Sequence, residues 1–230
     1  EERAVKTEKI IVPYKTATGM ASREFTVYRT HHGPIVREAN GKWVSVRIMQ
    51  EPVKRLMQSY GRTKAKNLAE YRKTMDLHAN SSNNTLYADA DGNIAMFFTN
   101  FVPKRDPRFE WNRPLDGSDP ATEWQGLLGN GDVPHAINPP SGWVYNANDW
   151  PWDAAGKGSV DRAKYPPYVE KSNNEMPRGV HAIRVLSGRK DFTIQGLIDA
   201  AYDSYQPAFA TSIPALVRAW DQLPQTSELR

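Results

Sequence analysis

The sequence contains no cysteine. It can therefore hold no disulfide, no thiolate zinc site and no cysteine nucleophile. No apolar run approaches the roughly 18–20 residues that a membrane span requires, so we expect no such span. No segment of these residues has the pattern of a signal peptide, and we expect none within them. The first residue is Glu1 rather than methionine, and we expect the chain to begin within a longer gene product.

Apolar residues are also scarce for a globular domain, at 39% of 230 residues, and the mean hydropathy is −0.67. The seven tryptophans and ten tyrosines nevertheless argue against disorder, because disordered chains are poor in aromatic residues. This combination indicates a folded but polar portion of a protein, with surface that other parts of that protein cover.

The net charge is +4, with a pI of about 9.2, but the basic residues are scattered among 26 acidic ones. A nucleic-acid-binding protein concentrates its positive charge on one face. The densest basic run, residues 64–73, is interrupted by Leu68 and Glu70, as on the solvent-exposed face of a helix. We expect no nucleic-acid partner.

Short β-branched and aromatic segments separated by turn residues predict four strands near the N-terminus. They are residues 8–13, 24–29, 34–37 and 42–49. Pro52 then begins a helix that ends at Gly61, with an apolar stripe along it, and Thr63 is the expected cap of a second helix. Asp-Gly between two apolar runs predicts a hairpin over residues 84–99.

The segment 100–176 holds most of the Pro and Trp and nearly half of the Gly, and we expect irregular but ordered structure there. Three helices are predicted at about 177–187, 193–205 and 212–222, with Thr193 and Thr211 or Ser212 as caps. We treat residues 1–230 as a single piece with strands and a helix pair in 1–100, the irregular segment in 100–176 and helices in 177–230.

Four segments carry patterns that recur together in one enzyme family. They are residues 29–36 (RTHHGPIV), residues 84–94 (NTLYADADGNI), the pair 114–117 and 123–126 (PLDG and EWQG, followed by Pro134), and residues 138–148 (NPPSGWVYNAN). In order and spacing they resemble the penicillin acylase family of N-terminal nucleophile hydrolases, which includes acyl-homoserine-lactone and aculeacin acylases. The chain resembles an interior fragment of the family's β-subunit.

The resemblance implies an α+β fold that forms part of a four-layer αββα sandwich, with a Pro/Trp-rich irregular segment and C-terminal helices. It implies hydrolysis of a linear amide by a serine at the β-subunit N-terminus, whose own α-amino group is the base. Because that serine lies outside this chain, we expect the chain alone to be inactive. The tetrahedral intermediate carries an oxyanion, and each donor to it is typically worth ~10²–10³ in kcat.

Two residues match catalytic positions of the family. Asn148, the second Asn of an Asn-x-Asn motif, matches the oxyanion-hole amide, and Arg178 matches an orienting arginine. An asparagine amide suits an oxyanion because it offers two donors without a charge. Both residues also have ordinary interpretations: Asn148 fits turn chemistry in Asn-Asp-Trp-Pro, and Arg178 fits a salt bridge at a helix start.

Three neighbours are candidate substrate-binding residues: Trp143, Tyr145 and Asn146. Trp143 and Tyr145 would share one face of a strand and could line an apolar acyl pocket, or they could belong to the core. Asn146 could equally satisfy buried backbone groups.

No metal site is predicted. His31 and His32 are adjacent strand residues that would point to opposite faces, so they would not line one site. Asp89, Asp91 and Asn93 resemble a calcium loop only faintly, because the distant glutamate is missing and a hairpin explains the Asp-Gly pair. Calcium remains possible in the complete enzyme, as in some family members. We expect no other cofactor.

The resemblance also implies partners and a location. The partners are a small acyl-amide substrate, the remainder of the β-subunit and an α-subunit cut from the same precursor, and the compartment is the periplasm or the exterior. A rival interpretation is a non-catalytic ligand-binding module with exposed aromatic residues, because the chain holds no complete catalytic set.

Overall fold

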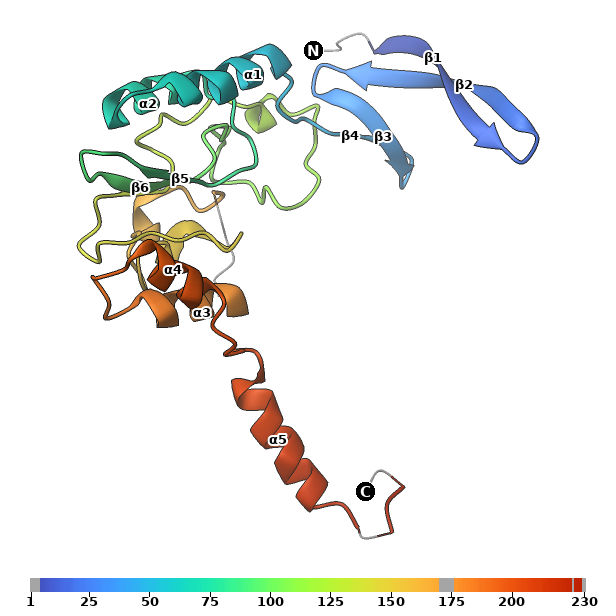
Figure 1. Ribbon diagram of the computed structural model, residues 1–230. Helices are drawn as coiled ribbons and strands as arrows, with labels where there is room; N and C mark the ends of the chain where they lie inside the picture. The colour runs from blue at the N-terminus through green and yellow to red at the C-terminus, as the bar shows by residue number, and fades with distance from the viewer. Residues whose placement is uncertain (1–4, 170–175, 225, 229–230) are drawn as a thin grey trace. The chain divides into compact units, whose positions relative to one another are not determined.

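The computed structural model describes residues 5–169, 176–224 and 226–228. It contains both strands and helices, which confirms the α+β class (Figure 1). The residues form two compact units: unit 1 comprises residues 1–52 and 103–126, and unit 2 comprises residues 53–102 and 127–230. Within the described residues, no helix has the length and apolar character to span a membrane.

Unit 1 is built on an antiparallel sheet in the order β1-β2-β3-β4. Its strands are β1 (Lys6–Thr16), β2 (Gly19–Thr30), β3 (Gly33–Ala39) and β4 (Lys42–Ser45). All four predicted strands are present. The first three are longer than the apolar pattern indicated, and β4 ends at Ser45, four residues before the predicted end. β1 and β2 pair along their whole length as a two-stranded ribbon.

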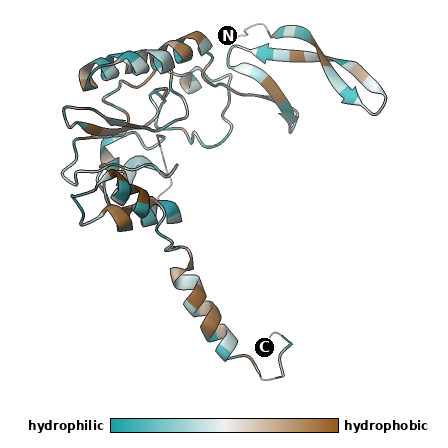
Figure 2. Ribbon diagram, viewed as in Figure 1, coloured by the Kyte–Doolittle hydropathy of each residue, from teal (hydrophilic) through white to brown (hydrophobic). Residues whose placement is uncertain are grey.

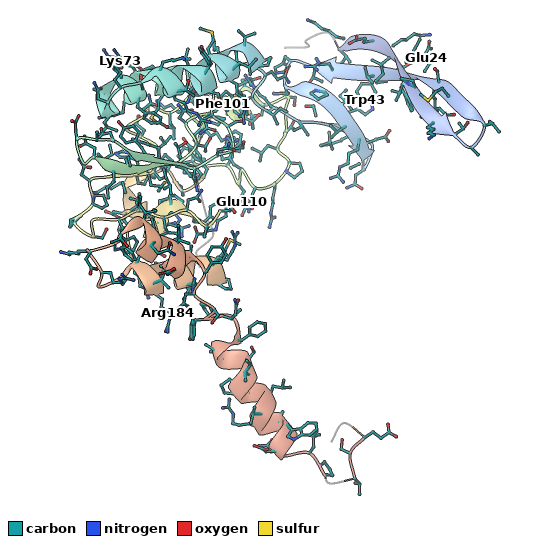
Figure 3. All side chains as sticks on the ribbon, viewed as in Figure 1. Glu24, Trp43, Lys73, Phe101, Glu110 and Arg184 are labelled. Atoms are coloured by element: carbon teal, nitrogen blue, oxygen red, sulfur yellow. The ribbon has the colours of Figure 1, made fainter. Side chains whose placement is uncertain are left out.

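Turn and cross-strand chemistry accounts for this sheet. Asn40 and Gly41 both have positive φ (54° and 71°), as a two-residue hairpin turn between β3 and β4 requires. On the ribbon, Lys9 Nζ lies 2.8 Å from Glu24 Oε1, and Figure 3 labels Glu24 on β2. Opposite charges on paired strands stabilise their register only modestly when exposed.

Unit 2 begins within α1 (Pro52–Gly61), at Val53, and this helix starts and ends at the predicted residues. Its apolar stripe, however, is exposed, whereas Gln58 is buried and accepts a hydrogen bond (2.7 Å) from the backbone N–H of Ala79. The following helix is α2 (Leu68–Met75). The predicted cap Thr63 is wrong, because Thr63 lies in the 3₁₀ turn Arg62–Lys64, and Asn67 caps α2 by accepting from Glu70 N–H (2.9 Å).

The central sheet of unit 2 has the order β5-β6-β7. It comprises β5 (Thr85–Ala88), β6 (Ile94–Phe97) and β7 (His135–Ile137). The first two strands form the predicted hairpin, and β7 was not predicted because three residues carry too little pattern. Tyr71 and Met75 of α2 pack against Ala95 and Phe97 of β6 in one buried cluster.

The segment 100–169 has little regular structure, as predicted. It contains three short 3₁₀ helices, namely η2 (Pro120–Thr122), η3 (Pro151–Asp153) and η4 (Arg162–Lys164). In unit 2, Trp152 forms a buried cluster with Ala136, Ala155 and Val160. Trp152 thus packs a part of this irregular segment against β7, as the sequence indicated.

Three helices close unit 2, as predicted: α3 (Pro177–Leu186), α4 (Ile194–Ala201) and α5 (Phe209–Asp221). Thr193 caps α4 by accepting from Gly196 N–H (3.0 Å), which confirms that cap. Thr211 and Ser212 are not caps, because α5 begins three residues before the predicted start. Figure 2 shows apolar residues along α5, none of which is buried.

Candidate active site

Asn148 lies in an exposed turn of unit 2 and has a left-handed backbone, with φ of 62°. Asparagine is one of the few residues with a side chain that adopts this conformation readily. The backbone N–H of Asn148 donates to Asn146 Oδ1 (3.0 Å), an Asx turn that closes the Asn-x-Asn motif. The sequence interpretations of Asn148 as a turn residue and as an amide donor are therefore compatible, because the turn presents the side chain.

Arg178 holds the side chain of Asn148. Its Nη1 and Nη2 donate to Asn148 Oδ1 at 3.3 Å and 3.2 Å. A guanidinium only donates, so the oxygen of the amide must face it and the NH₂ group must face away. Among the described residues, none accepts a hydrogen bond from Asn148 Nδ2. Asn148 and Arg178, which are 30 positions apart, are thus brought together as predicted. In this arrangement the neutral amide of Asn148 presents two N–H donors.

Asn146 also stabilises the turn at Asn148. Its Oδ1 also accepts from Asn84 Nδ2 (3.2 Å), and Asn84 Nδ2 lies 3.4 Å from the carbonyl oxygen of Asp149. Asn84 precedes β5, so the hairpin of the second motif holds the turn of the fourth. Asn146 Oδ1 therefore accepts two hydrogen bonds, from Asn148 N–H and from Asn84 Nδ2. This arrangement accords with the structural interpretation of Asn146.

Asp149 makes a second set of contacts that supports the Asn148 turn, and the sequence analysis did not predict its role. Asp149 Oδ2 accepts from the hydroxyl of Tyr145 (3.0 Å), and Asp149 Oδ1 lies 3.4 Å from Ala147 N. Asp149 also packs on the first turn of α3, where a Cβ on the buried Gly179 would lie 2.0 Å from Asp149 Oδ2. A carboxylate at a helix N-terminus is favoured by the helix dipole.

These contacts link the two candidate residues through the backbone. Asp149 follows Asn148 directly, and Gly179 follows Arg178 directly. The close approach of Asp149 to Gly179 therefore sets how far the Asn148 turn lies from the start of α3. The signal in the sequence was a glycine in the first turn of a predicted helix, where its only advantage is room for a neighbour.

The three predicted substrate-binding residues differ in exposure. Tyr145 is only 8% exposed and packs with Ala147 and Leu186, and Asn146 is exposed. Trp143 is half-buried and lies 6.4 Å from the Tyr145 ring, centroid to centroid. The expected strand is absent here, because residues 143–146 have no regular structure. Contact with substrate stays a prediction for all three.

A cavity of about 440 Å³ lies beside Arg178 in the same unit. Its walls come from α3, α4 and the chain after α4, including Ala182, Leu186, Leu197 and Tyr205. The guanidinium carbon of Arg184, a residue labelled in Figure 3, lies 3.9 Å from the ring centroid of Tyr205. This contact holds the Tyr205 ring in place at the edge of the cavity. The cavity is large enough for a small acyl group.

The whole chain, residues 1–230, matches the family model of penicillin amidase. The chain belongs to the penicillin amidase family. It is 31% identical to penicillin G acylase from Escherichia coli over 131 residues, which are 55% of this chain and 15% of that protein. It also has the fold of a thermostable penicillin G acylase from Alcaligenes faecalis, with a TM-score of 0.73 and 24% identity over 98% of this chain and 39% of that one.

The hairpin motif of this penicillin amidase family member is a self-contained turn. The Asp89 carboxylate accepts from Asp91 N, Asn93 N and the Tyr87 hydroxyl (2.8 Å). Burial alone would raise the pKa of Asp89, but hydrogen bonds hold it below its ordinary value, first those from the side-chain amide of Asn93 and then the three named above. Burial and the same carboxylate raise the pKa of Tyr87 to about 12. These donors account for the role of Asp89 in the hairpin turn.

The first family motif, residues 29–36 in unit 1, differs from one prediction. His31 and His32 lie in the turn between β2 and β3 rather than on a strand, so they do not point to opposite faces. Their ring centroids are 3.8 Å apart. His31 Nε2 lies 2.6 Å from Glu123 Oε1, and Arg47 Nη1 lies 2.6 Å from Glu123 Oε2. The first and third motifs therefore meet at Glu123.

Proposed function

We propose that the complete protein is an acylase that hydrolyses the amide bond between an acyl group and an amine. The Nδ2 amide of Asn148 donates to the oxyanion of the tetrahedral intermediate, and Arg178 orients that amide. The observation that supports this proposal is the pair of hydrogen bonds from Arg178 to Asn148 Oδ1, which directs both amide N–H donors away from Arg178.

The reaction needs a nucleophile, which a terminal serine on polypeptide outside this chain supplies. Its hydroxyl oxygen attacks the amide carbon, and its own α-amino group takes the proton. The carbonyl oxygen becomes negative and accepts from Asn148 Nδ2. Collapse of the intermediate expels the amine, which takes the proton, and water then releases the acyl group from the serine. Donors fixed before the reaction stabilise the charge without reorganisation.

The substrate class follows from the family and remains part of the proposal. Candidates are the amide side chains of β-lactams, acyl-homoserine lactones and acylated peptides, in a periplasmic or secreted enzyme assembled from two subunits of one precursor. The two relatives described above are penicillin G acylases, and this chain spans 15% and 39% of their lengths. Trp143 is our candidate for contact with the acyl group, and it lines a hollow with Ala155 and Ser187 that is separate from the cavity beside Arg178.

The test is Asn148→Gly in the full-length protein. Glycine adopts positive φ without strain, so this variant removes the amide and leaves the turn intact. We expect kcat to fall ~10²–10³-fold with little change in KM, because the lost interaction forms only in the transition state. Asn148→Asp retains an oxygen for Arg178 but replaces the donors with a negative charge, and we expect it to be at least as inactive.

The matched control is Asn40→Gly. Asn40 also has a left-handed backbone, with φ of 54°, but it lies in the β3–β4 turn of unit 1. We expect its activity to be that of the unmodified protein. A near-normal kcat for Asn148→Gly would remove the oxyanion role, and absence of any amidase activity in the unmodified full-length protein would favour the rival binding module.

A further inference from the structure

Unit 1 contains a cluster of potential metal ligands that the acylase chemistry does not use. One ligand atom from each of His31, His32 and Glu123 lies within 4.8 Å of the other two. The histidines come from the β2–β3 turn, and Glu123 follows the 3₁₀ helix η2, 91 positions along the chain from His32. Two distant segments thus bring two imidazoles and a carboxylate together.

The hydrogen bonds around the cluster leave suitable atoms facing inward. His32 Nε2 lies 2.9 Å from the carbonyl oxygen of Gly117. A carbonyl only accepts, so this ring nitrogen carries the proton, and in the neutral ring Nδ1 is a bare lone pair. That Nδ1 is the atom 3.9 Å from Glu123 Oε1. Histidine ligands typically donate their other ring nitrogen to an outer partner in this way.

The carboxylate has a similar arrangement. Arg47 Nη1 holds Glu123 Oε2 at 2.6 Å, so Oε1 is the oxygen directed at the histidines. Arg47 itself is fixed by Trp124, whose ring centroid lies 4.5 Å from the guanidinium carbon. Two of the three potential ligands are therefore oriented by partners outside the cluster.

We propose that His31 Nε2, His32 Nδ1 and Glu123 Oε1 form a binding site for a divalent transition-metal ion, with Zn²⁺ as the best fit. Zinc ligands at ~2.0–2.2 Å in a tetrahedron lie about 3.4 Å from one another. The separations of 2.6 Å and 3.9 Å from Glu123 Oε1 lie on either side of this value. Small side-chain rotations reach the tetrahedral geometry, and water completes it.

The ligand set selects the class of ion. Two imidazole nitrogens suit zinc, copper and nickel, whereas calcium and magnesium take oxygen ligands. Binding replaces the hydrogen bond between His31 and Glu123 with two metal bonds, and His31 must present an unprotonated Nε2. The positive charge of Arg47 opposes the ion, so we expect moderate affinity. The ion ties the β2–β3 turn to the segment 103–126 and strengthens unit 1.

The experiment is a zinc titration of the purified full-length protein after removal of metals with EDTA, in competition with a fluorescent zinc chelator at neutral pH. We expect one zinc ion per chain. His32→Gln keeps an N–H that can reach Gly117 but removes Nδ1, and Glu123→Gln keeps the side-chain shape but removes the anionic ligand. Each change is expected to weaken zinc binding by at least ~10-fold.

The matched control is His181→Gln. His181 Nε2 lies 2.9 Å from Asp203 Oδ1 in unit 2, and no second histidine contacts that pair among the described residues. We expect zinc binding of this variant to be unchanged, and circular dichroism verifies that all variants are folded.

An independent readout on the unmodified protein is ¹⁵N NMR of the histidine side chains, in which zinc should shift two imidazoles. Failure to bind one zinc, equal weakening by His181→Gln, or NMR shifts at other histidines would each overturn the proposal.

Discussion

Gly179→Ala tests the contact that links the two candidate catalytic residues. In an open helical position this change stabilises a protein by about 1 kcal/mol, because alanine has the higher helix propensity. At Gly179 the new Cβ would lie 2.0 Å from Asp149 Oδ2 and 2.9 Å from the Tyr145 hydroxyl. Neither distance is tolerable, so Asp149 must move or α3 must shift.

The expected magnitude follows from the two costs. Overpacking of a tight site costs ~1–3 kcal/mol. Loss of the hydrogen bond from Tyr145 to the Asp149 carboxylate costs a further ~1.5–3 kcal/mol if the carboxylate leaves. After subtraction of the helix-propensity gain of about 1 kcal/mol, we expect the free energy of unfolding to fall by about 1.5–5 kcal/mol when both costs apply. Because Asp149 directly follows Asn148, we also expect kcat of the full-length enzyme to fall.

The assay is urea unfolding followed by tryptophan fluorescence, with Gly61→Ala as the matched control. Gly61 has helical dihedrals (φ −57°, ψ −39°) and its new Cβ would meet only Thr74 Cγ2, at an ordinary 3.6 Å. We expect Gly61→Ala to be neutral or stabilising. In an Asp149→Ala background, Gly179→Ala should lose most of its cost. A Gly179→Ala protein as stable as Gly61→Ala would refute the close approach.

Two further predictions concern α2 and the hairpin. Asn67→Ala removes the cap of α2 and should lower the free energy of unfolding by about 1 kcal/mol in urea, whereas Thr63→Ala should change it by less than ~0.5 kcal/mol because Thr63 is not a cap. The pKa of Tyr87 is raised to about 12, so its contribution to stability should be complete below pH 10.0 and lost as the pH rises through 12. Absorbance titration should therefore show a late-ionising tyrosine that is missing in Tyr87→Phe, and ionisation of all tyrosines near pH 10.0 would contradict this.

Local patterns predicted the elements of the fold well where one residue type decides the backbone. Pro52 set the start of α1 because its ring fixes φ, and Asp91-Gly92 set the hairpin because Gly92 supplies the positive φ of the turn. α1 also ends at the predicted Gly61, but with helical dihedrals and a 3₁₀ turn after it. Prediction failed where two candidates competed for one role. Thr63 and Asn67 are both good caps, and only the position of the next turn decides between them.

The face that a helix buries was less predictable. The apolar stripe of α1 is exposed in this chain, and the contacts of the helix within unit 2 include polar ones. Gln58 is buried because its amide oxygen satisfies a backbone N–H at Ala79, which lies far along the chain. A hydrogen bond between distant segments leaves no periodic signal in the sequence.

The candidate site was predictable only through the family resemblance. Nothing local distinguishes Asn148 from other turn asparagines, or relates it to Arg178 30 positions later. The roles of Asp149 and Gly179 depend on a contact between a turn and a helix start, which spacing cannot reveal. The turn position of His31 and His32 was missed because adjacent strand residues alternate, whereas adjacent turn residues need not.

The polar contacts that hold α1 have a consequence for anyone who re-engineers this protein. Four of its large apolar side chains are 56–70% exposed, while Arg55 and Gln58 bond to Ser81 and Ala79. The side chains of Arg55 and Gln58 hold α1 in unit 2 through hydrogen bonds, so apolar substitutions at these two positions would lower the stability of the unit. Hydrophilic replacements at Val53 or Leu56 should instead make the isolated chain easier to keep in solution, with these hydrogen bonds untouched.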